Sequence, residues 1–471
     1  MKVPESPPSF EDFISEATEA QDMKTLATIA NVFVGSGVKP FDNKGRYLHW
    51  EKLKHQEPPG ELTAEQHWFA VRLARQKLHQ ELPFTDMTGN KFVYCQAGPV
   101  VNDLLWISEQ AKGAVAADPK ITDPKTRDTY LISSLIEESI NSSQLEGAST
   151  THRVAKEMIL TARAPRDKSE QMILNNYRAM LFIKENINDE LTPSMVFELH
   201  RILTEKTFEA GYEHKAGAFR AAEDDIAVCD DMTGEVLHRP PHAAELPERL
   251  QAVCDFANGK TGDPMIPSLI RAIVVHFMIG YDHPFFDGNG RTARALFYWL
   301  VMKEGFWLLE HVSISGIIKA AQPSYIKAYL HTETDGSDVT YFIIHQLDVV
   351  RKAIVRLHEY LLRKTQELRD TEAALHDSVL RGRMNHRQLA VIKHAMRNPG
   401  AHYTVNSHQT SHGVTNQTAR SDLCALSDSY GLLLRTRQGR KDVFVAPGNI
   451  NERIKSARPK RRVRKKRPES K

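Results

Sequence analysis

The chain has 471 residues, of which 41% are hydrophobic and 26% are charged, and its formal net charge is +3. A chain of this length is expected to form two or three domains, and its composition is that of an ordinary globular protein rather than a disordered one. The most apolar stretch, residues 293–302, is too short to cross a bilayer, and no secretory signal opens the chain. Neither membrane insertion nor secretion is therefore expected.

The charge of the chain is unevenly distributed. Residues 452–471 carry 11 lysines and arginines against two glutamates, a net +9, which leaves the rest of the chain at −6. The basic tail, residues 449–471, is expected to be disordered. The four cysteines lie far apart and form no CxxC pair, which argues against a disulfide framework or a zinc ribbon. A reducing, cytoplasmic location is therefore predicted.

The N-terminal region, residues 1–125, is predicted to be helical. Thr63 and Gln66 form a capping box, in which the threonine side chain and the glutamine side chain satisfy each other's backbone N–H groups. A helical pattern over residues 68–82 follows this box.

Helical patterns continue through residues 126–345. Thr192 and Pro193 supply the N-cap and the first-turn proline of a helix. Apolar residues also recur at helical spacing over 174–181 and 270–277, so a mainly α fold is expected.

One segment interrupts the helical pattern of residues 126–345. Residues 226–229 and 235–238 are short runs on either side of a turn that contains Gly234. Two short runs joined by a glycine-containing turn are typical of a β-hairpin.

The C-terminal third of the chain changes texture again. A long, charged helical pattern from residue 339 to about 375 precedes residues 385–446, which read as a helix, a short helix, a third helix and a β-hairpin of residues 432–436 and 443–446 around Gly439. This order predicts a winged helix-turn-helix. The predicted division is a linker helix over 346–380, a winged helix-turn-helix over 381–448 and the basic tail over 449–471.

Residues 283–294 carry the strongest chemical signal and read HPFFDGNGRTAR. Gly288 and Gly290 form a turn between two helical patterns, and a turn that opens a helix points several backbone N–H groups at one anion. Arg291 and Arg294, three apart, project from the first helical turn and can hold phosphate oxygens. The segment therefore predicts a turn that binds polyphosphate.

Two further side chains of this segment suit phosphoryl or nucleotidyl transfer. Asp287 is a hard oxygen ligand of the kind that Mg²⁺ takes together with waters and phosphates. His283 carries an imidazole that can take a proton from an attacking hydroxyl. Because positioning and charge neutralisation do most of the catalysis in such reactions, a base, a metal ligand and a phosphate cradle are the parts required.

The segment matches the motif HxFx(D/N)GNGRxxR, and through it the chain resembles the Fic family over about residues 130–345. The matching positions are His283, Phe285, Asp287, Gly288, Asn289, Gly290, Arg291 and Arg294. The resemblance implies a Fic-type helical bundle with a β-hairpin flap over residues 126–345. It also implies an enzyme that transfers AMP from ATP to Ser, Thr or Tyr hydroxyls of proteins, the chain itself included.

The resemblance implies a role for each matched residue. His283 deprotonates the target hydroxyl, Asp287 holds Mg²⁺, and Phe285 anchors the loop in the core. Arg294 grips the γ-phosphate, so that the α-phosphate of ATP faces the nucleophile. Related Doc-type kinases depart from the pattern in the anion-hole residues, so the match favours AMP transfer. The resemblance also implies that Asn289, Gly290 and Arg291 line the anion hole for the α- and β-phosphates, with Gly288 as a further phosphate-binding residue.

Residues 142–147 read SSQLEG and match the family's inhibitory motif, (S/T)xxxE(G/N), at Ser142, Glu146 and Gly147. Ser142 and Glu146 share a helix face, and Gly147 is where such a helix would end. The resemblance implies an inhibitory helix over about residues 134–147, whose Glu146 pairs with Arg294 and so removes the γ-phosphate clamp. Some relatives use this glutamate to position water and remove AMP, and which direction dominates here stays open.

The predicted hairpin lies where the family places its flap, at about residues 224–240. An exposed strand edge can align an extended target segment through backbone hydrogen bonds, and Ile226 and Val228 are candidates for covering the nucleotide. A plain surface hairpin is the alternative. Tyr325 is a candidate for the border of the adenine pocket.

The predicted winged helix carries a candidate nucleic-acid face. Residues 415–426 would be its recognition helix, and the wing and the basic tail would contact phosphates. Asp422 and Asp428 interrupt a continuous basic face, and winged helices also dock proteins, so both partners stay open. The candidate contacts are Asn416, Gln417, Arg420 and Ser421 in the helix, and Arg437, Arg440 and Lys441 in the wing.

Three functions are consistent with these patterns. The favoured one is a self-inhibited protein adenylyltransferase that uses ATP and Mg²⁺. The second is a transcriptional regulator whose Fic-type core senses nucleotide while the winged helix binds DNA. The third is a kinase or a transferase of another nucleotide.

Overall fold

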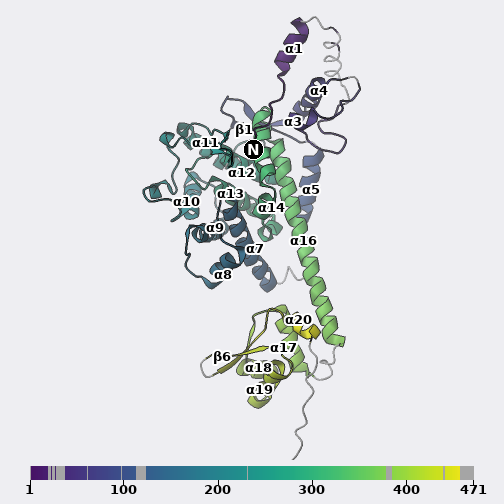
Figure 1. Ribbon diagram of the computed structural model, residues 1–471, viewed down its shortest axis with the longest axis vertical. Coiled ribbons are helices and arrows are strands. Elements are labelled where there is room, and N and C mark those ends of the chain that lie inside the picture. Colours follow the sequence, from purple (N-terminus) through teal and green to yellow (C-terminus); the bar gives the residue numbers. More distant parts are fainter. Residues whose placement is uncertain are drawn as a thin grey trace, which may run out of the picture. The chain divides into compact units, whose positions relative to one another are not determined.

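The computed structural model of the chain describes residues 2–19, 23, 27, 38–60, 62–96, 98–112, 124–230, 232–377, 384–438 and 441–456. The chain divides into two compact units, residues 1–357 and 358–471. Both units consist mainly of helices, in agreement with the predicted mainly α class (Figure 1).

The N-terminal part of the first unit combines helices with a hairpin. Its capping box at Thr63 and Gln66 is formed as predicted. The helix that follows ends at Gln76, however, and residues 79–85 are a strand, so the prediction of a helix through residue 82 is wrong. Its elements are α1 (Phe10–Glu19), α3 (Trp50–Leu53), α4 (Ala64–Gln76), β1 (His79–Thr85), β2 (Lys91–Cys95) and α5 (Gly98–Lys112).

A turn explains why this segment becomes a hairpin. The Asp86 carboxylate accepts hydrogen bonds from the backbone N–H groups of Thr88 and Asn90, which closes a tight turn between the two strands. Leu82 and Phe84 then alternate inward along β1 with period two. The short apolar run fits a helix and a strand equally well in the sequence, and the turn with tertiary burial decides it.

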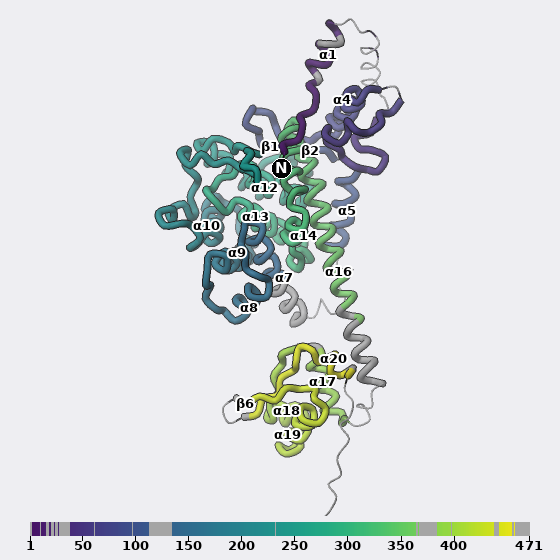
Figure 2. Tube along the Cα trace, in the orientation of Figure 1, coloured from purple at the N-terminus to yellow at the C-terminus, as the bar shows by residue number. Residues whose placement is uncertain are grey.

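The N-terminal hairpin belongs to the main core of the first unit. Phe92 of β2 lies edge-on to Phe277 and Tyr281, with ring centroids 5.5 and 5.0 Å apart, and the hairpin lies beside α12 in the trace (Figure 2). Residues 1–125 and the helices that follow therefore share one compact unit, and the boundary expected near residue 125 does not separate two cores.

The remaining helices of the first unit surround two central ones. They are α7 (Pro124–Leu145), α8 (His152–Thr161), α9 (Lys168–Glu185), α10 (Pro193–Thr204), α11 (Leu246–Ala257), α12 (Ser268–Asp282), α13 (Asn289–Lys303), α14 (Ile314–Ala320), α15 (Gln322–Thr334) and α16 (Thr340–Asp377). Short 3₁₀ turns occupy Glu213–Lys215, Ala222–Asp224, Ala243–Glu245 and Trp307–His311.

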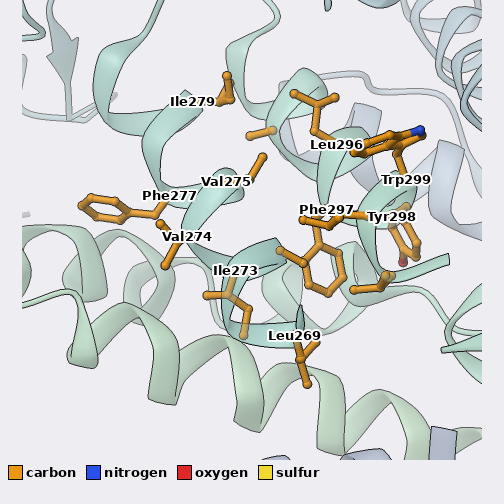
Figure 3. Close-up of a cluster of buried hydrophobic side chains, with 14 of the residues drawn as sticks. Leu269, Ile273, Val274, Val275, Phe277, Ile279, Leu296, Phe297, Tyr298 and Trp299 are labelled. Carbon is orange, nitrogen blue, oxygen red and sulfur yellow. The ribbon is translucent and has the colours of Figure 1, made fainter. Parts of the chain in front are cut away.

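The central helices α12 and α13 form the middle of the core. Ile273, Val274 and Phe277 of α12, and Leu296 and Trp299 of α13, are buried among one another and their neighbours (Figure 3). Helices that are apolar on every face are expected inside a domain rather than at its surface. The turn between them, residues 283–288, is therefore held at both ends by well-packed helices.

The predicted flap hairpin is present but short. Strand β3 (Val228–Cys229) pairs antiparallel with β4 (Val236–His238), in the register Val228 to His238 and Cys229 to Val236. Ile226 lies outside the strands, whereas Val228 begins the first one.

Helix α16 does more than link two parts of the chain. Leu347, Val350 and Ile354 are buried in the first unit's core. The first turns of the predicted linker helix over residues 346–380 therefore also pack in the core of the first unit through their apolar face.

The second unit has its own core, which includes Ile392, Leu423 and Phe444. Its three strands pair antiparallel in the order β5-β7-β6. Strand β5 was not predicted. Arg440 and Gly439 of the predicted wing, and residues 457–471, lie outside the described residues. The elements are α17 (His386–Arg397), β5 (His402–Thr404), α18 (Val405–His412), α19 (Asn416–Cys424), a π turn (Ala425–Ser429), β6 (Leu434–Gln438), β7 (Lys441–Val445) and α20 (Ile450–Ser456).

The beginning of the predicted disordered tail is a helix. Ile450 and Ile454 of α20, four residues apart, are both buried in the core of the second unit. The charge of residues 452–471 hid this apolar pair from a prediction based on composition.

Candidate active site

The segment 283–294 begins with a strained residue. Helix α12 ends at Asp282, and His283 adopts a left-handed conformation with φ 46°, while its N–H still donates to the carbonyl of Ile279 at 3.2 Å. A histidine in this region is uncommon and carries a conformational cost of about 1 kcal/mol or more. The bend turns the chain sharply away from the helix axis and presents the imidazole beside the turn that follows.

The next residues fasten the loop to the core. Phe285 is fully buried and stacks on the His200 ring at a centroid distance of 3.8 Å. The side chain of Asn289 accepts from the N–H of Phe285 at 2.9 Å and donates to its carbonyl at 2.8 Å. Asn289 therefore contributes its side chain to the shape of the loop, and only its backbone N–H is available for an anion.

Two glycines, Gly288 and Gly290, lie where helix α13 begins. Gly288 has φ 86°, and a Cβ there would lie 3.0 Å from Thr204 Cγ2. The first intrahelical bond runs from Thr292 N to Gly288 O at 3.0 Å, so the N–H groups of residues 289–291 have no partner within the helix. They point out of the positive end of α13, which favours an anion.

The carboxylate of Glu146 lies over this helix start. A Cβ added to Gly290 would be 2.3 Å from Glu146 Oε1, so only glycine permits this approach. The carboxylate comes from the end of α7, where the chain turns at Gly147 with φ 89°. An anionic group of the protein itself therefore lies over the nest of N–H groups.

Arg294 holds the same carboxylate from the other side. Its guanidinium donates to Glu146 Oε1 at 2.8 Å, to Ser142 Oγ at 2.9 Å and to the Ser142 carbonyl at 3.1 Å. Arg294 is only 2% exposed, so its charge is balanced mainly by these partners. Ser142 and Glu146 thus meet Arg294 at one place, although Glu146 and Arg294 are 148 residues apart in the chain. Gly147 lies in the turn that follows Glu146, and no hydrogen bond of the described residues joins it to Arg294.

The guanidinium of Arg291 has a different environment from the one predicted. It is 1% exposed, and it donates to the carbonyl of Leu203 at 3.0 Å and to Asp287 Oδ2 at 3.3 Å. The expectation that the Arg291 side chain projects toward phosphate is therefore wrong, because helix α10 covers it. Its backbone N–H remains part of the nest.

Asp287 is the accessible carboxylate of the loop. Its side chain is 45% exposed, with Oδ1 accepting from the N–H of Gly288 at 2.6 Å and Oδ2 facing Arg291. A single exposed carboxylate next to an anion site fits Mg²⁺ that arrives with phosphates and keeps its waters. Among the described residues, no cluster of three or more His, Cys, Asp or Glu side chains could hold a metal without such a substrate.

This geometry coincides with a known family. Residues 190–301 match the family model described as Fic/DOC, and the loop 283–294 lies within that range. The chain is therefore similar to the Fic/DOC family over this range. Glu146 lies before the matched range and the hairpin β3–β4 lies inside it.

Curated relatives carry the same family name. The chain is 28% identical over 173 residues to the protein adenylyltransferase Fic of Nematostella vectensis, covering 35% of this chain and 37% of that protein. It is 23% identical over 184 residues to the protein adenylyltransferase fic-1 of Caenorhabditis elegans, covering 38% and 33%. The chain thus spans about a third of the length of these relatives.

A solved structure is also similar. It is a Fic family protein from Desulfovibrio desulfuricans, with a TM-score of 0.47 and 19% identity, covering 75% of this chain and 98% of that chain.

Burial sets the protonation state of His283 in the loop 283–294. It lowers the pKa of His283 to about 4, the carbonyl of Gly280 and the carboxylate of Glu146 oppose this effect, and the cations His238 and Arg220 add to it. The ring is therefore neutral at physiological pH and has a lone pair with which to accept a proton.

Tyr325 lies close to Arg294. Its hydroxyl is hydrogen-bonded to His276 Nε2 at 2.9 Å and lies 3.4 Å from the hydroxyl of Tyr329. Burial raises the pKa of Tyr325, and the charge of Arg294 opposes the rise. The residue is close to the site, in a network of polar groups among helices α12, α13 and α15.

The flap carries exposed apolar groups on its turn. Met232 is 96% exposed and Val236 is 40% exposed, whereas Val228 is half-buried. The candidates for covering the nucleotide, Ile226 and Val228, are thus less exposed than the turn residue Met232.

Three polar residues around the loop were missed by sequence reasoning. His200 accepts from Gly217 N at 2.9 Å through Nδ1, so its Nε2–H donates to the Asp287 carbonyl at 2.7 Å. Arg220 and His238, both less than 9% exposed, contact the backbone at the end of α12. Each is a single polar residue in an ordinary local pattern, so the sequence alone contains no signal that would have singled it out.

Proposed function

We propose that the chain is a protein adenylyltransferase that transfers AMP from ATP to Ser, Thr or Tyr hydroxyls of proteins. The observation that carries the proposal is the nest of N–H groups at the start of α13, with a neutral imidazole beside it and the Glu146 carboxylate over it. An anion site next to a base is the arrangement that transfer from a nucleoside triphosphate requires. The names of the curated relatives support the same activity.

In the proposed reaction, one bond to the α-phosphorus forms and another breaks. The target hydroxyl oxygen attacks this phosphorus, the bond from it to the β-phosphate oxygen breaks, and pyrophosphate leaves. His283 takes the hydroxyl proton, for which its neutral ring is suited. The N–H groups of residues 289–291 stabilise the charge on the α- and β-phosphate oxygens.

Magnesium fits the exposed carboxylate of Asp287. Mg²⁺ bound there would neutralise phosphate charge in the transition state. The carboxylate is fixed for this role by Gly288 N and by the buried Arg291 guanidinium.

The proposed brake is the pairing of Glu146 with Arg294. As long as this pair is intact, Arg294 is unavailable for a γ-phosphate, and Glu146 repels a phosphate from the nest. Ser142 strengthens the pair by holding the same guanidinium through two bonds. Glu146 could also position water for the removal of AMP, so the enzyme would then work in both directions.

The flap is proposed to align the target. Because β3 and β4 form a two-stranded sheet, an extended segment can pair with an open strand edge next to the loop. Ile226 and Val228 would cover the nucleotide, with Tyr325 at the adenine side. The target class is therefore an exposed, extended segment with a hydroxyl side chain.

The decisive experiment follows label from ATP. Glu146→Gly should raise the incorporation of label from [α-³²P]ATP into the protein itself or a lysate, while [γ-³²P]ATP should leave none. His283→Ala in that background should remove the label but keep nucleotide binding. Label from the γ position would select a kinase, and the absence of any α-label would refute the proposal.

A second function is favoured by the face of helix α19. Thr415 caps the helix, Asn416 and Gln417 are exposed in its first turn, and Arg420 is 60% exposed. Asp422, expected to interrupt this face, is buried and pairs with Arg387 at 2.7 Å and His408 at 3.3 Å, so that expectation is wrong. We propose that the second unit is a winged helix that binds DNA through this face, with Ser421, Arg437 and Lys441 as further contacts.

Binding of DNA to this face would require the carboxylate of Asp442 to leave its arginine partners. Asp442 pairs with Arg435 at 2.6 Å and Arg420 at 3.3 Å. DNA phosphates would replace it, so affinity should fall with salt. Gel shifts on random and genomic fragments at rising salt test this, and operator binding that changes with ATP would select the transcriptional regulator. Binding of a protein instead would identify the face as a docking surface.

We propose a cytoplasmic location, for which the wide spacing of the four cysteines is the support. Among the residues that the structure describes, every helix is too short or too polar to span a bilayer.

A further inference from the structure

The end of helix α12 leaves carbonyl groups that the helix itself cannot satisfy. The last four carbonyls of a helix have no intrahelical donor, and here the chain turns into the left-handed His283 instead of continuing. The carbonyls of residues 281–284 all accept hydrogen bonds from two residues that flank the flap. These two residues are Arg220 and His238.

Arg220 is the first of them. Its Nε donates to the carbonyl of His283 at 2.8 Å, its Nη2 to that of Asp282 at 3.4 Å, and its backbone N–H to that of Pro284 at 2.9 Å. Nη2 also donates to the carbonyl of Pro241, which follows the flap. One buried side chain thus joins the segment before the flap, the segment after it and the catalytic loop.

His238 is the second and closes the flap strand β4. Its Nε2 faces the carbonyl of Tyr281 at 2.7 Å, and its Nδ1 faces Glu333 Oε2 at 2.8 Å. Both partners are acceptors, so both ring nitrogens must carry a proton to make both bonds. Hydrogen-bond geometry therefore indicates an imidazolium, held between α15 and the end of α12.

The two residues act on the same place from both sides of the hairpin. Arg220 precedes the flap and His238 ends it, and each donates to the backbone that carries His283. Two cations at the C-terminus of α12 also complement its negative end.

We propose that Arg220 and His238 are positioning residues that fasten the base of the flap to the backbone of His283, so that the target-aligning strand and the general base move as one piece. The inference rests on the adenylyltransferase function proposed above. It adds that the order of the flap sets the geometry of proton transfer, and that loosening either fastening lowers the rate of transfer without weakening ATP binding.

The charges have a second effect on the base. Burial lowers the pKa of His283 most, both cations lower it in addition, and the Gly280 carbonyl and Glu146 raise it. The groups that face His238 are Glu333 on α15 and Asp282 on α12, and Glu333 raises its pKa against the effect of burial. Removing the His238 charge should therefore raise the pKa of His283 toward its ordinary value.

A kinetic and pH experiment tests the inference. In the Glu146→Gly background we would measure AMP incorporation from [α-³²P]ATP for His238→Gln, Arg220→Gln, Arg220→Lys and Glu333→Gln. His242→Gln is the matched control, because His242 is exposed and lies just beyond Pro241. Unfolding temperature and ATP affinity would be recorded for each protein.

We expect kcat to fall by about 10- to 100-fold for His238→Gln and Arg220→Gln, since a small misplacement near the reacting atoms has effects of that order. The KM for ATP should stay within about twofold, because neither residue touches the nest. Arg220→Lys should restore part of the rate. The acid limb of the pH profile should move to higher pH for both His238→Gln and Glu333→Gln. The first variant removes the cation next to His283, and the second removes the carboxylate that raises the pKa of His238, so less positive charge remains near His283.

The outcomes separate this inference from the function on which it rests. An inactive Glu146→Gly protein would refute the adenylyltransferase itself. An active one, in which His238→Gln and His242→Gln share the same kcat and acid limb, would refute the positioning role alone. If His238→Gln fails to fold, Glu333→Gln decides, because it removes the partner charge from a side chain that is 21% exposed while His238 keeps its bond to the Tyr281 carbonyl.

Discussion

The ion pair between Glu146 and Arg294 predicts a change in thermal stability that can be measured without an activity assay. Replacing Glu146 by glutamine keeps the size of the side chain and removes its charge. Breaking an ion pair of which one partner stays buried costs about 3–5 kcal/mol. The Glu146 side chain is 28% exposed, and Ser142 still accepts two bonds from Arg294, so we expect about 2 kcal/mol.

The expected change in Tm follows from the size of the unit. Unfolding entropy near Tm is about 2.1 cal/mol/K per residue, which gives about 0.75 kcal/mol/K for residues 1–357. A loss of about 2 kcal/mol then lowers Tm by about 3 °C. A triphosphate analogue with a methylene bridge between its α- and β-phosphates, at about 100 times its Kd, adds about 2.7 kcal/mol, or about 4 °C. The wild type should gain less, because Glu146 competes with the γ-phosphate.

Differential scanning fluorimetry with and without the analogue and Mg²⁺ is the assay. Glu137→Gln is the matched control, since Glu137 lies on the same helix, is 39% exposed and faces only His152 at 3.4 Å. An equal rise in Tm for the wild type and Glu146→Gln on addition of the analogue would refute the competition. A Tm loss no larger than that of Glu137→Gln would refute the energetic weight given to the pair.

Three further predictions follow from other parts of the structure. Gly290→Ala in the Glu146→Gly background should abolish label transfer, because a Cβ would occupy the place of the anion; Gly448→Ala, with nothing within 4 Å, is the control, and retained labelling would contradict the nest. Phe285→Ala should cost about 3–5 kcal/mol, or about 5 °C in Tm of the first unit by calorimetry, because the ring is fully buried. The stability that the His238–Glu333 pair contributes is present below the ordinary histidine pKa of 6.5 and is lost as pH rises through the raised pKa of His238 in the folded protein. The difference in Tm between the wild type and His238→Gln should therefore become smaller above neutral pH. A difference that becomes larger would contradict the imidazolium.

Under the proposed function, a single carboxylate would control the activity. Glu146 pairs with Arg294, which would clamp the last phosphate, and lies against Gly290, where the N–H nest would hold the first two. The same residue would therefore block two parts of the substrate at once. A partner that pulls the end of α7 away would free both, and this makes α7 the natural place for a regulatory contact.

The local chemistry of residues 283–294 was readable from the sequence, since the loop glycines, Asp287 and His283 act through short-range geometry. The capping box at Thr63, the N-cap at Thr192 and the extent of α16 were predicted for the same reason, because neighbours in the chain determine them. The flap hairpin was predicted from its turn residues, although its strands are shorter than expected.

The errors arose where distant residues decide the outcome. The strand β1 replaced a predicted helix because β2 pairs with it and Phe92 of β2 packs on α12. Helix α20 replaced a predicted tail because Ile450 and Ile454 are buried in the core of the second unit. The Arg291 side chain was predicted to hold phosphate and Asp422 to interrupt a basic face, yet α10 covers the first and Arg387 pairs with the second.

The sequence by itself determined which residues form the phosphate turn and where the helices around it begin, because those features depend on φ preferences, caps and the spacing of side chains within one element. Tertiary structure alone decided which of the charged groups face the turn and which are buried as supports, because burial and pairing depend on contacts between residues far apart in the chain. Arg220 and His238 belong wholly to this second kind: nothing in their neighbourhood along the chain distinguishes them, and only the packing of the flap against the end of α12 brings them to the backbone of His283.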